Sequence, residues 1–393
     1  MHITKRRLVA VGAALGVATL VLSACGTSGG GDASSDGPIT EVGDGEGQVS
    51  ILAWPGYVED GSNDPDVDWV TPFEESTGCT VTAQTYGTSD EAYQLMQEGG
   101  FDVVAASGDL TLRLIANGSV QPINTDLIDS YDGIYDFLKD RDWNSVDGQM
   151  YGVPHGYGAN LLAYNTDVYT TAPTSWDVVF DKASEQQGKI TAYDSPIYIA
   201  DAAVYLMAHN PDLGITNPYA LDEDQLAAAV DLLKAQRENI TEYWSDYLLE
   251  IQGLEAGSIV AGTTWQVIIN SLAEDTPVAA VLPDEGATGW SDTWMVAADS
   301  EHVNCSYKWL DWIASPEGNA MATEYFGEAP NNAGACEYTQ DPNHCDSYHA
   351  GDEDYASQIW YWTTPIAECL DGRTDVECTD YAAWTSAWQE IQG

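Results

Sequence analysis

The chain has 393 residues, of which 63 are Asp or Glu and 12 are Lys or Arg, and its formal net charge is −51. A charge of this sign and size excludes nucleic acid as a partner, because the phosphate backbone repels it. The same charge repels anionic lipid, so attachment to a membrane needs an anchor. A dense acidic surface with few lysines predicts a high-salt habitat, where the Debye length falls to about 3 Å and self-repulsion is screened. The length exceeds one typical domain and predicts two lobes.

The chain begins with a segment typical of exported lipoproteins. Basic residues 5–7 precede an uncharged apolar run over residues 8–22, which is short for a membrane-spanning helix but fits a signal-peptide core. The run ends in the sequence LSAC, which resembles the bacterial lipobox, where the cysteine receives a diacylglycerol and the chain is cut just before it. We therefore expect residues 1–24 to be a lipoprotein signal peptide and Cys25 to be lipidated. An ordinary secretory peptide with a chance cysteine is the alternative.

The next segment predicts a flexible tether. Residues 25–48 consist mainly of Gly, Ser and acidic residues, with too few apolar side chains to bury a core. No later apolar run reaches the length of a membrane span. We expect the rest of the chain to be a domain outside the cytoplasm, held at the bacterial cell surface or in the periplasm through the lipid on Cys25.

An even number of cysteines remains for disulfides, which form outside the cytoplasm. They are Cys79, Cys305, Cys336, Cys345, Cys369 and Cys378. The near pairs, 336 with 345 and 369 with 378, would each close a short loop and leave Cys79 with Cys305, although spacing alone does not fix the connectivity. The rival hypothesis is a metal site formed by Cys336, His344, Cys345 and His349. Its spacing fits no established zinc pattern, so we expect no metal.

Short apolar strands alternate with helices in the first part of the domain. Strands are predicted at residues 49–54, 79–83 and 101–105, and helices at 68–77 and 90–97. This alternation predicts an α/β domain with a mostly parallel sheet. Ligands of such sheets bind beyond the carboxyl ends of the strands, where the loops at 54–57 and 107–109 lie.

Two glycine-rich segments interrupt this pattern and predict crossovers between lobes. They cover residues 151–158 and 286–297. Between them a second α/β unit is predicted, with strands at 190–193 and 278–282, a helix at 223–238, and a segment at 258–266 leading into a helix. The end of the chain is predicted to be helical at 307–313 and 381–391.

Several short motifs, in order along the chain, carry a resemblance. They are WPGY at 54–57, PFEESTG at 72–78, FDVV at 101–104, PTSWD at 173–177, GTTW at 262–265, GWSD at 289–292 and the helical region 307–317. From about residue 49 onwards the chain resembles the substrate-binding proteins of ABC transporters, in the branch that includes the spermidine/putrescine-binding proteins. The resemblance implies a two-lobed, periplasmic-binding-protein-like α/β fold of type II with two crossover hinge strands. Lobe 1 would comprise residues 49–157 and 290–393, and lobe 2 residues 158–289.

The family resemblance implies a receptor and not an enzyme. It would be a monomer without a cofactor that closes on a ligand and is recognised by membrane permease subunits. The sequence agrees, since it contains no GxSxG, HExxH or GxxxxGK[ST] motif. A same-fold receptor for a neutral sugar or peptide is one alternative. An anchored hydrolase with paired carboxylates is another.

A polyamine needs carboxylates for its ammonium groups and aromatic faces for its methylenes and its charge. Trp290 and Asp292 would face the same side if they lie in a strand, and the resemblance makes Asp292 the ligand of a terminal ammonium. The full set of expected ligand contacts is Trp54, Tyr57, Ser107, Asp109, Tyr157, Asp194, Trp265, Trp290, Asp292 and Glu328.

The chain also departs from the family pattern at its expected charges. Ile197 and Gly56 stand where relatives have acids, and Asp109 and Glu328 stand where the spermidine-binding branch has aromatic residues. The expected ligand is therefore a small organic cation related to spermidine or putrescine, with its exact identity open.

Overall fold

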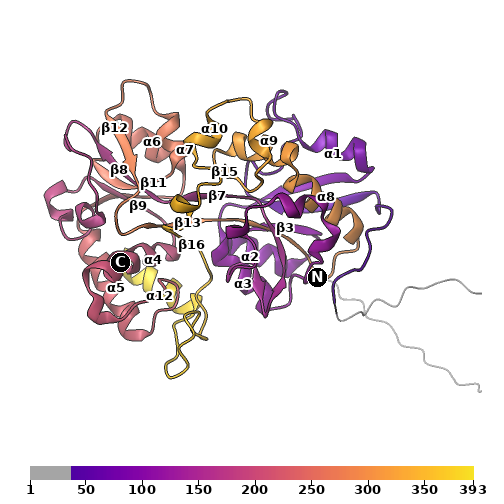
Figure 1. Cartoon of the computed structure of the whole chain (residues 1–393). Coiled ribbons are helices and arrows are strands. Elements are labelled where there is room, and N and C mark those ends of the chain that lie inside the picture. The colour runs from indigo at the N-terminus through magenta and orange to yellow at the C-terminus, as the bar shows by residue number, and fades with distance from the viewer. Residues whose placement is uncertain (1–36) are drawn as a thin grey trace, which may run out of the picture. The chain divides into compact units, whose positions relative to one another are not determined.

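The computed structural model describes residues 37–393, and the signal peptide and Cys25 lie outside this range (Figure 1). The first sheet has the strand order β2-β1-β3-β14-β6. Its strands are β1 (Gln48–Ala53), β2 (Thr80–Thr85), β3 (Val103–Ala106), β6 (Gly152–Pro154) and β14 (Thr293–Val296). The first three run parallel, whereas β14 is antiparallel to both β3 and β6. A late segment of the chain is thus built into the middle of an early sheet.

Successive side chains of a strand point to opposite faces of a sheet, and in this sheet apolar side chains point to both faces. Helices therefore cover both faces. Val49 and Ile51 pack on the side of α1 (Val70–Thr77) and α8 (Val303–Ala314). Leu52 and Val104 pack on the side of α2 (Ser89–Glu98) and α3 (Gly108–Ala116). The helix α9 (Pro316–Phe326) follows α8 and packs against it.

The second sheet has the order β10-β9-β11-β8-β12. Its strands are β8 (Leu161–Asn165), β9 (Ile190–Tyr193), β10 (Ile240–Trp244), β11 (Ala261–Thr264) and β12 (Val278–Val281). Its helices are α4 (Ile199–His209), α5 (Glu223–Arg237), α6 (Tyr247–Glu255) and α7 (Gln266–Ser271). The strand β8 runs antiparallel to both of its neighbours.

The crossover segments pair with each other in a small sheet of order β15-β7-β13-β16. The strand β7 (Gly156–Ala159) connects β6 of the first sheet to β8 of the second, and β13 (Ala287–Trp290) connects β12 back to β14. The strands β15 (Ala329–Pro330) and β16 (Ile359–Tyr361) flank them. The lobe boundaries predicted from the sequence fall within β7 and β13 and stay a prediction.

The C-terminal helix α12 (Tyr381–Gln392) packs on α5, although the sequence analysis groups it with the first lobe. Lys234 of α5 pairs with Glu390, and Arg237 donates to the carbonyl of Ile391 at 2.7 Å. The chain therefore passes from the first sheet to the helices of the second once more after β16.

The remaining elements are short. In the part of the chain that the structure describes they are β4 (Ser145–Val146), β5 (Gln149–Met150), α10 (His344–Ser347), α11 (Glu353–Ala356) and eight 3₁₀ turns at 125–127, 129–133, 136–138, 176–178, 183–186, 196–198, 211–213 and 335–337. No helix within residues 37–393 is long and apolar enough to cross a membrane.

The predicted helices and strands are present within a few residues, but the sheets are mixed and not mostly parallel. The sequence pattern predicts parallel strands because strands and helices alternate. The crossover strands instead return directly from the small sheet, without an intervening helix, so β14, β6 and β8 run against their neighbours.

Within residues 37–393, three disulfides join Cys79 to Cys305, Cys336 to Cys345, and Cys369 to Cys378. The two cysteines of the rival metal hypothesis are thus bonded to each other, and residues 37–393 contain no cluster of potential metal ligands.

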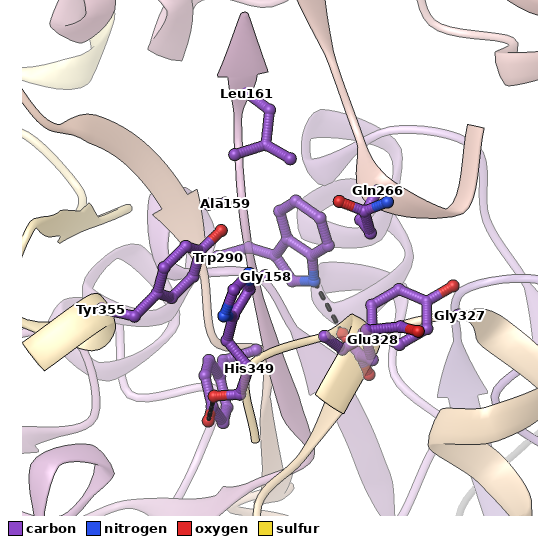
Figure 2. Close-up of a pocket in the computed structure, with 12 residues that line it drawn as sticks. Gly158, Ala159, Leu161, Gln266, Trp290, Gly327, Glu328, His349 and Tyr355 are labelled. Carbon is purple, nitrogen blue, oxygen red and sulfur yellow. Dashed lines mark hydrogen bonds between the residues drawn. The ribbon is translucent and has the colours of Figure 1, made fainter. Parts of the chain in front are cut away.

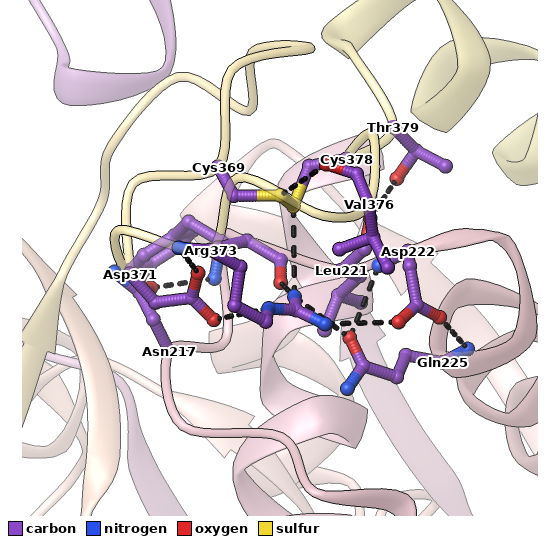
Figure 3. The surroundings of a disulfide bond; sticks show 12 residues. Asn217, Leu221, Asp222, Gln225, Cys369, Asp371, Arg373, Val376, Cys378 and Thr379 are labelled. Atoms are coloured by element: carbon purple, nitrogen blue, oxygen red, sulfur yellow. Dashed lines mark hydrogen bonds and ion pairs between the residues drawn. A yellow bond between two sulfur atoms is a disulfide. The ribbon is translucent and has the colours of Figure 1, made fainter.

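The loop closed by the third disulfide is attached to α5 through Arg373 (Figure 3). The guanidinium of Arg373 pairs with Asp222, the N-cap of α5, at 2.9 Å and donates to the carbonyl of Ala220 at 2.6 Å. It also pairs with Asp371 within the loop at 2.8 Å. One cation therefore holds the loop against the start of a helix.

The last part of the predicted tether makes defined contacts with the domain. The carboxylate of Glu46 accepts hydrogen bonds from the backbone of Asn304 and Cys305 at the start of α8. Gly45 crosses the first disulfide so closely that a Cβ there would lie 2.6 Å from Cys79 Sγ and 2.9 Å from Cys305 Sγ. The folded region therefore begins before β1.

Candidate ligand-binding cleft

A cavity of about 300 Å³ lies between loops of the two larger sheets. Its walls come from the ends of β1, β3, β9 and β11 and from the crossover at β13–β14. The lining residues are Trp54, Pro55, Tyr57, Tyr86, Gly87, Ser107, Tyr193, Ser245, Asp246, Tyr247, Trp265, Trp290, Asp292, Phe326 and Trp362. Six of the ten predicted contacts are in this set, in the place predicted for a ligand of an α/β sheet.

Asp292 is the buried carboxylate of this cavity. It lies between β13 and β14 and is 3% exposed. The hydroxyl of Tyr57 donates to its Oδ2 at 2.9 Å, whereas Oδ1 is buried and has no partner among the described residues. Burial raises the pKa of Asp292 to about 7, although the neighbouring hydroxyls of Ser107 and Tyr57 act in the opposite direction. Oδ1 of Asp292 is therefore a buried acceptor that can receive a hydrogen bond from a ligand.

Aromatic rings make up most of the remaining wall. The ring of Trp54 lies 4.4 Å from that of Tyr86. On the other side Tyr193 stacks on Trp362, with centroids 5.6 Å apart and planes inclined by 17°. The rings of Trp265 and Trp290 lie 5.2 Å apart. Such faces attract cations by about 0.5–2 kcal/mol each.

The N–H groups of three cavity tryptophans are bonded within the protein. Trp54 donates to Ser107 Oγ at 3.0 Å, Trp265 to Asn160 Oδ1 at 2.9 Å, and Trp290 to Glu328 Oε2 at 2.7 Å. The indole N–H of Trp362 is buried and has no partner among the described residues. The set of lining residues contains no Lys, Arg or His. The cavity thus offers π faces and acceptors, with few free donors.

A second cavity of about 140 Å³ shares the walls of Trp54, Tyr193 and Trp362. It contains the predicted contacts Asp109 and Asp194. Asp109 is buried and accepts hydrogen bonds from Ser89 at 2.9 Å and from Tyr381 at 3.2 Å. Burial is the main cause that raises its pKa.

Asp194 is exposed, and its Oδ1 accepts from the indole of Trp388 at 3.2 Å and from Gln392 at 2.5 Å. Both of these donors belong to α12. The two acids therefore line the second cavity and not the larger one that contains Asp292.

The predicted contacts Tyr157 and Glu328 line a third space of only about 20 Å³ behind Trp290 (Figure 2). Glu328 is fully buried, and burial raises its pKa well above the ordinary value, with the charge of Asp292 adding to the effect. The hydroxyl of Tyr157 donates to the carbonyl of His349 and accepts from Gly351 N–H. Neither residue lies in the wall of the larger cavity.

Several wall residues were not predicted. They are Pro55, Tyr86, Gly87, Tyr193, Ser245, Asp246, Tyr247, Phe326 and Trp362. Tyr193 precedes the predicted contact Asp194, and Tyr86 follows a predicted strand, so their positions at strand ends were the available signal. Trp362 follows β16, and nothing in the local sequence places it in the cavity.

The comparisons agree with this architecture. The description "bacterial extracellular solute-binding protein" applies to a family that matches residues 68–345. The putrescine-binding periplasmic protein SpuD of Pseudomonas aeruginosa (strain UCBPP-PA14) is 25% identical over 317 residues, which cover 72% of this chain and 82% of that protein.

Solved structures show the same fold. A putative spermidine/putrescine ABC transporter from Listeria monocytogenes aligns with a TM-score of 0.69 and 19% identity, over 88% of this chain and 99% of that one. The protein MotA from A. tumefaciens B6, solved in complex with glucopine, aligns with a TM-score of 0.62 and 16% identity, over 88% of this chain and 100% of that one. Because the match to the family profile covers well over half of its length, this chain belongs to the bacterial extracellular solute-binding proteins, the non-enzymatic ligand-binding components of ABC transporters.

Proposed function

We propose that this protein is a lipid-anchored receptor that binds a polyamine or a related small organic cation in the cavity around Asp292 and delivers it to an ABC importer. The observation that carries the proposal is the unpartnered oxygen of Asp292 at the wall of an aromatic cavity. An ammonium group donates several hydrogen bonds, and a charge-assisted bond to a carboxylate is among the stronger ones.

The donor-poor wall favours a cation over an anion or a zwitterion. A ligand with a carboxylate needs Arg, Lys or several N–H donors, and the lining set has no basic side chain. The aromatic faces favour the methylene groups and the positive charge of an amine. A cavity of about 300 Å³ is at the small end of typical ligand sites, which span roughly 300–1,000 Å³.

The acids of the second cavity supply a place for a second ammonium group. Asp109 and Asp194 lie in a space that shares three aromatic walls with the first cavity. A diamine would thus have one end at Asp292, its methylenes between the shared aromatic rings, and its other end towards these acids. A monoamine would use only the first cavity.

Thermal shift of the mature protein against putrescine, spermidine, cadaverine, γ-aminobutyrate, glucose and a tripeptide tests this function. A ligand that binds only the folded state stabilises it by RT ln(1 + [L]/Kd), which is about 2.7 kcal/mol at a hundredfold excess over Kd. We expect stabilisation by the diamines and polyamines. A shift from the sugar, peptide or amino acid with no response to any amine would contradict the proposal.

The acidic surface of the domain agrees with an anchor at Cys25. With a formal net charge of −51 the protein is repelled by anionic lipid, so only the lipid would keep it near the membrane permease. Metabolic labelling with a palmitate analogue should mark the wild-type chain and not Cys25→Ser. Equal labelling of both would reject lipidation at this residue.

A further inference from the structure

Glu328 touches the ligand cavity only through another side chain. Its Oε2 accepts the indole N–H of Trp290 at 2.7 Å (Figure 2). Trp290 lines both spaces, whereas Glu328 lines only the small one behind it. Glu328 is therefore placed to hold Trp290 and not to contact a solute.

The crossover strand β7 is shaped for this pair. A Cβ on Gly158 would lie 2.2 Å from Trp290 Cζ2, and a Cβ on Gly156 would lie 2.5 Å from Glu328 Oε1. Real Cβ atoms do not approach other atoms this closely, so both positions need glycine. The Gly-Tyr-Gly segment thus provides space for the indole at one residue and for the carboxyl group at the other.

A buried histidine connects the same unit to Asp292. The indole N–H of Trp294 donates to His155 Nδ1 at 3.0 Å, so Nε2 carries the proton of the neutral ring. This Nε2 lies 3.5 Å from Glu328 Oε1, and the backbone N–H of His155 donates to the carbonyl of Asp292 at 2.7 Å. His155 therefore lies next to Glu328 and is hydrogen-bonded through its backbone to the residue that carries the free acceptor.

We propose that Glu328 is a positioning residue that fixes the plane of Trp290 in the wall of the ligand cavity, with Gly156 and Gly158 providing the space for both side chains. The part that concerns affinity rests on the proposed function, whereas the part that concerns Trp290 holds for the ligand-free protein. Glu328 acts as a hydrogen-bond acceptor for the indole, so its charge is not required.

Two substitutions test separately whether Trp290 needs the hydrogen-bond acceptor of Glu328 or its negative charge. Glu328→Gln keeps an acceptor for the indole N–H and removes the charge, whereas Glu328→Leu removes the acceptor at similar size. In the ¹⁵N–¹H spectrum of the ligand-free protein, the indole signal that disappears in Trp290→Phe is the reporter. We expect this signal to stay near its wild-type position in the Gln variant, and to shift upfield and broaden in the Leu variant.

Affinity for putrescine and spermidine, measured by calorimetry, is the second readout. We expect the Gln variant to bind within about threefold of wild type and the Leu variant to bind at least about fivefold more weakly, as for loss of a buried hydrogen-bond partner. A Leu variant with the wild-type indole signal would overturn the proposal. So would a Gln variant as impaired as the Leu variant in both readouts, because charge would then be the requirement.

Glu285→Leu is the matched control. Glu285 is also an acid with a side chain that is only 5% exposed and with hydrogen-bonded partners, Ser175 and His209, but it lies outside the cavity walls. It should lose stability while the Trp290 signal and the amine affinity stay unchanged. If wild-type protein binds neither amine, the proposed function fails, and the indole signal still decides the role of Glu328.

Discussion

The hydroxyl of Tyr57 donates a 2.9 Å hydrogen bond to one carboxylate oxygen of Asp292, and the other oxygen is buried without a partner among residues 37–393. The two residues are 235 positions apart in the chain, in the loop after β1 and in the crossover before β14. The bond orients the carboxylate and uses only half of its capacity. The free oxygen is the most direct attachment point for a cationic group.

Asp292→Asn should weaken the binding of putrescine or spermidine by about 10- to 150-fold, because a hydrogen bond to a charged group contributes about 1.5–3 kcal/mol. The amide is nearly isosteric, so the cavity shape is kept while the charge is lost. Calorimetric titration measures the change. Asp354→Asn, which removes an exposed acid on α11, is the control for net charge and should bind like wild type. A loss of less than about fivefold in Asp292→Asn would show that Asp292 does not hold the cation.

Binding of a cation should release a proton near neutral pH. Burial raises the pKa of Asp292 to about 7 in the ligand-free protein, and a bound ammonium favours the ionised form. Affinity should therefore rise about tenfold from pH 6 to pH 8 and then level off. Calorimetry in buffers of different ionisation enthalpy should show about half a proton released per ligand at pH 7. The Asn variant should lack this dependence, and a pH-independent wild type would contradict the assignment.

The raised pKa of Asp292 also makes the stability of the ligand-free protein depend on pH. Because the pKa of Asp292 is higher in the folded than in the unfolded state, the folded protein binds the proton more tightly. The contribution to stability is fully present below about pH 4 and is lost as the pH rises through about 7. Asp292→Asn should thus raise the melting temperature at pH 8 more than at pH 5.

Salt should stabilise the fold. The formal net charge of −51 generates self-repulsion that added ions screen, since the Debye length falls from about 10 Å at 0.1 M to about 3 Å at 1 M. The melting temperature should rise by several degrees between these concentrations of NaCl. Sorbitol at matched osmolality should give a smaller rise. A melting temperature that does not change with NaCl would reject the high-salt hypothesis.

Arg373→Met should destabilise the protein by about 1–3 kcal/mol, because the guanidinium makes charge-assisted bonds to the N-cap of α5 and to the disulfide loop. Only 26% of the arginine side chain is exposed, so solvent screens these bonds less than those of a surface pair. Urea denaturation measures the loss. Lys182→Met removes the more exposed pair with Asp177 and should cost less stability than Arg373→Met. A loss for Arg373→Met no larger than that for Lys182→Met would contradict the prediction.

The cleft residues that the sequence could predict are those that directly follow a strand. Trp54 and Ser107 follow buried strands, and the carboxyl ends of neighbouring parallel strands meet at one edge of a sheet. Local sequence therefore places such residues near each other without knowledge of the tertiary packing. Asp292 was found differently, through its motif in the second crossover.

The features that the sequence did not place depend on long-range packing. Glu328 is one residue before β15, but its side chain lies behind Trp290 because glycines on β7 leave space there. After β16 the chain passes from the first sheet to the helices of the second. Trp362 lies at the start of this passage and lines the cavity, and α12 lies at its end and packs on α5. No local periodicity encodes which surface a late segment meets, so these positions required the structure.

Gly45 crosses directly over the buried Cys79–Cys305 disulfide and so restricts the access of thiol reagents to it. A thiol reagent can reach these sulfurs only after the residues before β1 have lifted away from α8. The rate at which the bond is reduced therefore measures how often the start of the domain detaches. In the lipid-anchored receptor that we propose, a force transmitted from the membrane anchor acts on this N-terminal end of the domain. The disulfide keeps the start of β2 covalently joined to α8 under such a force.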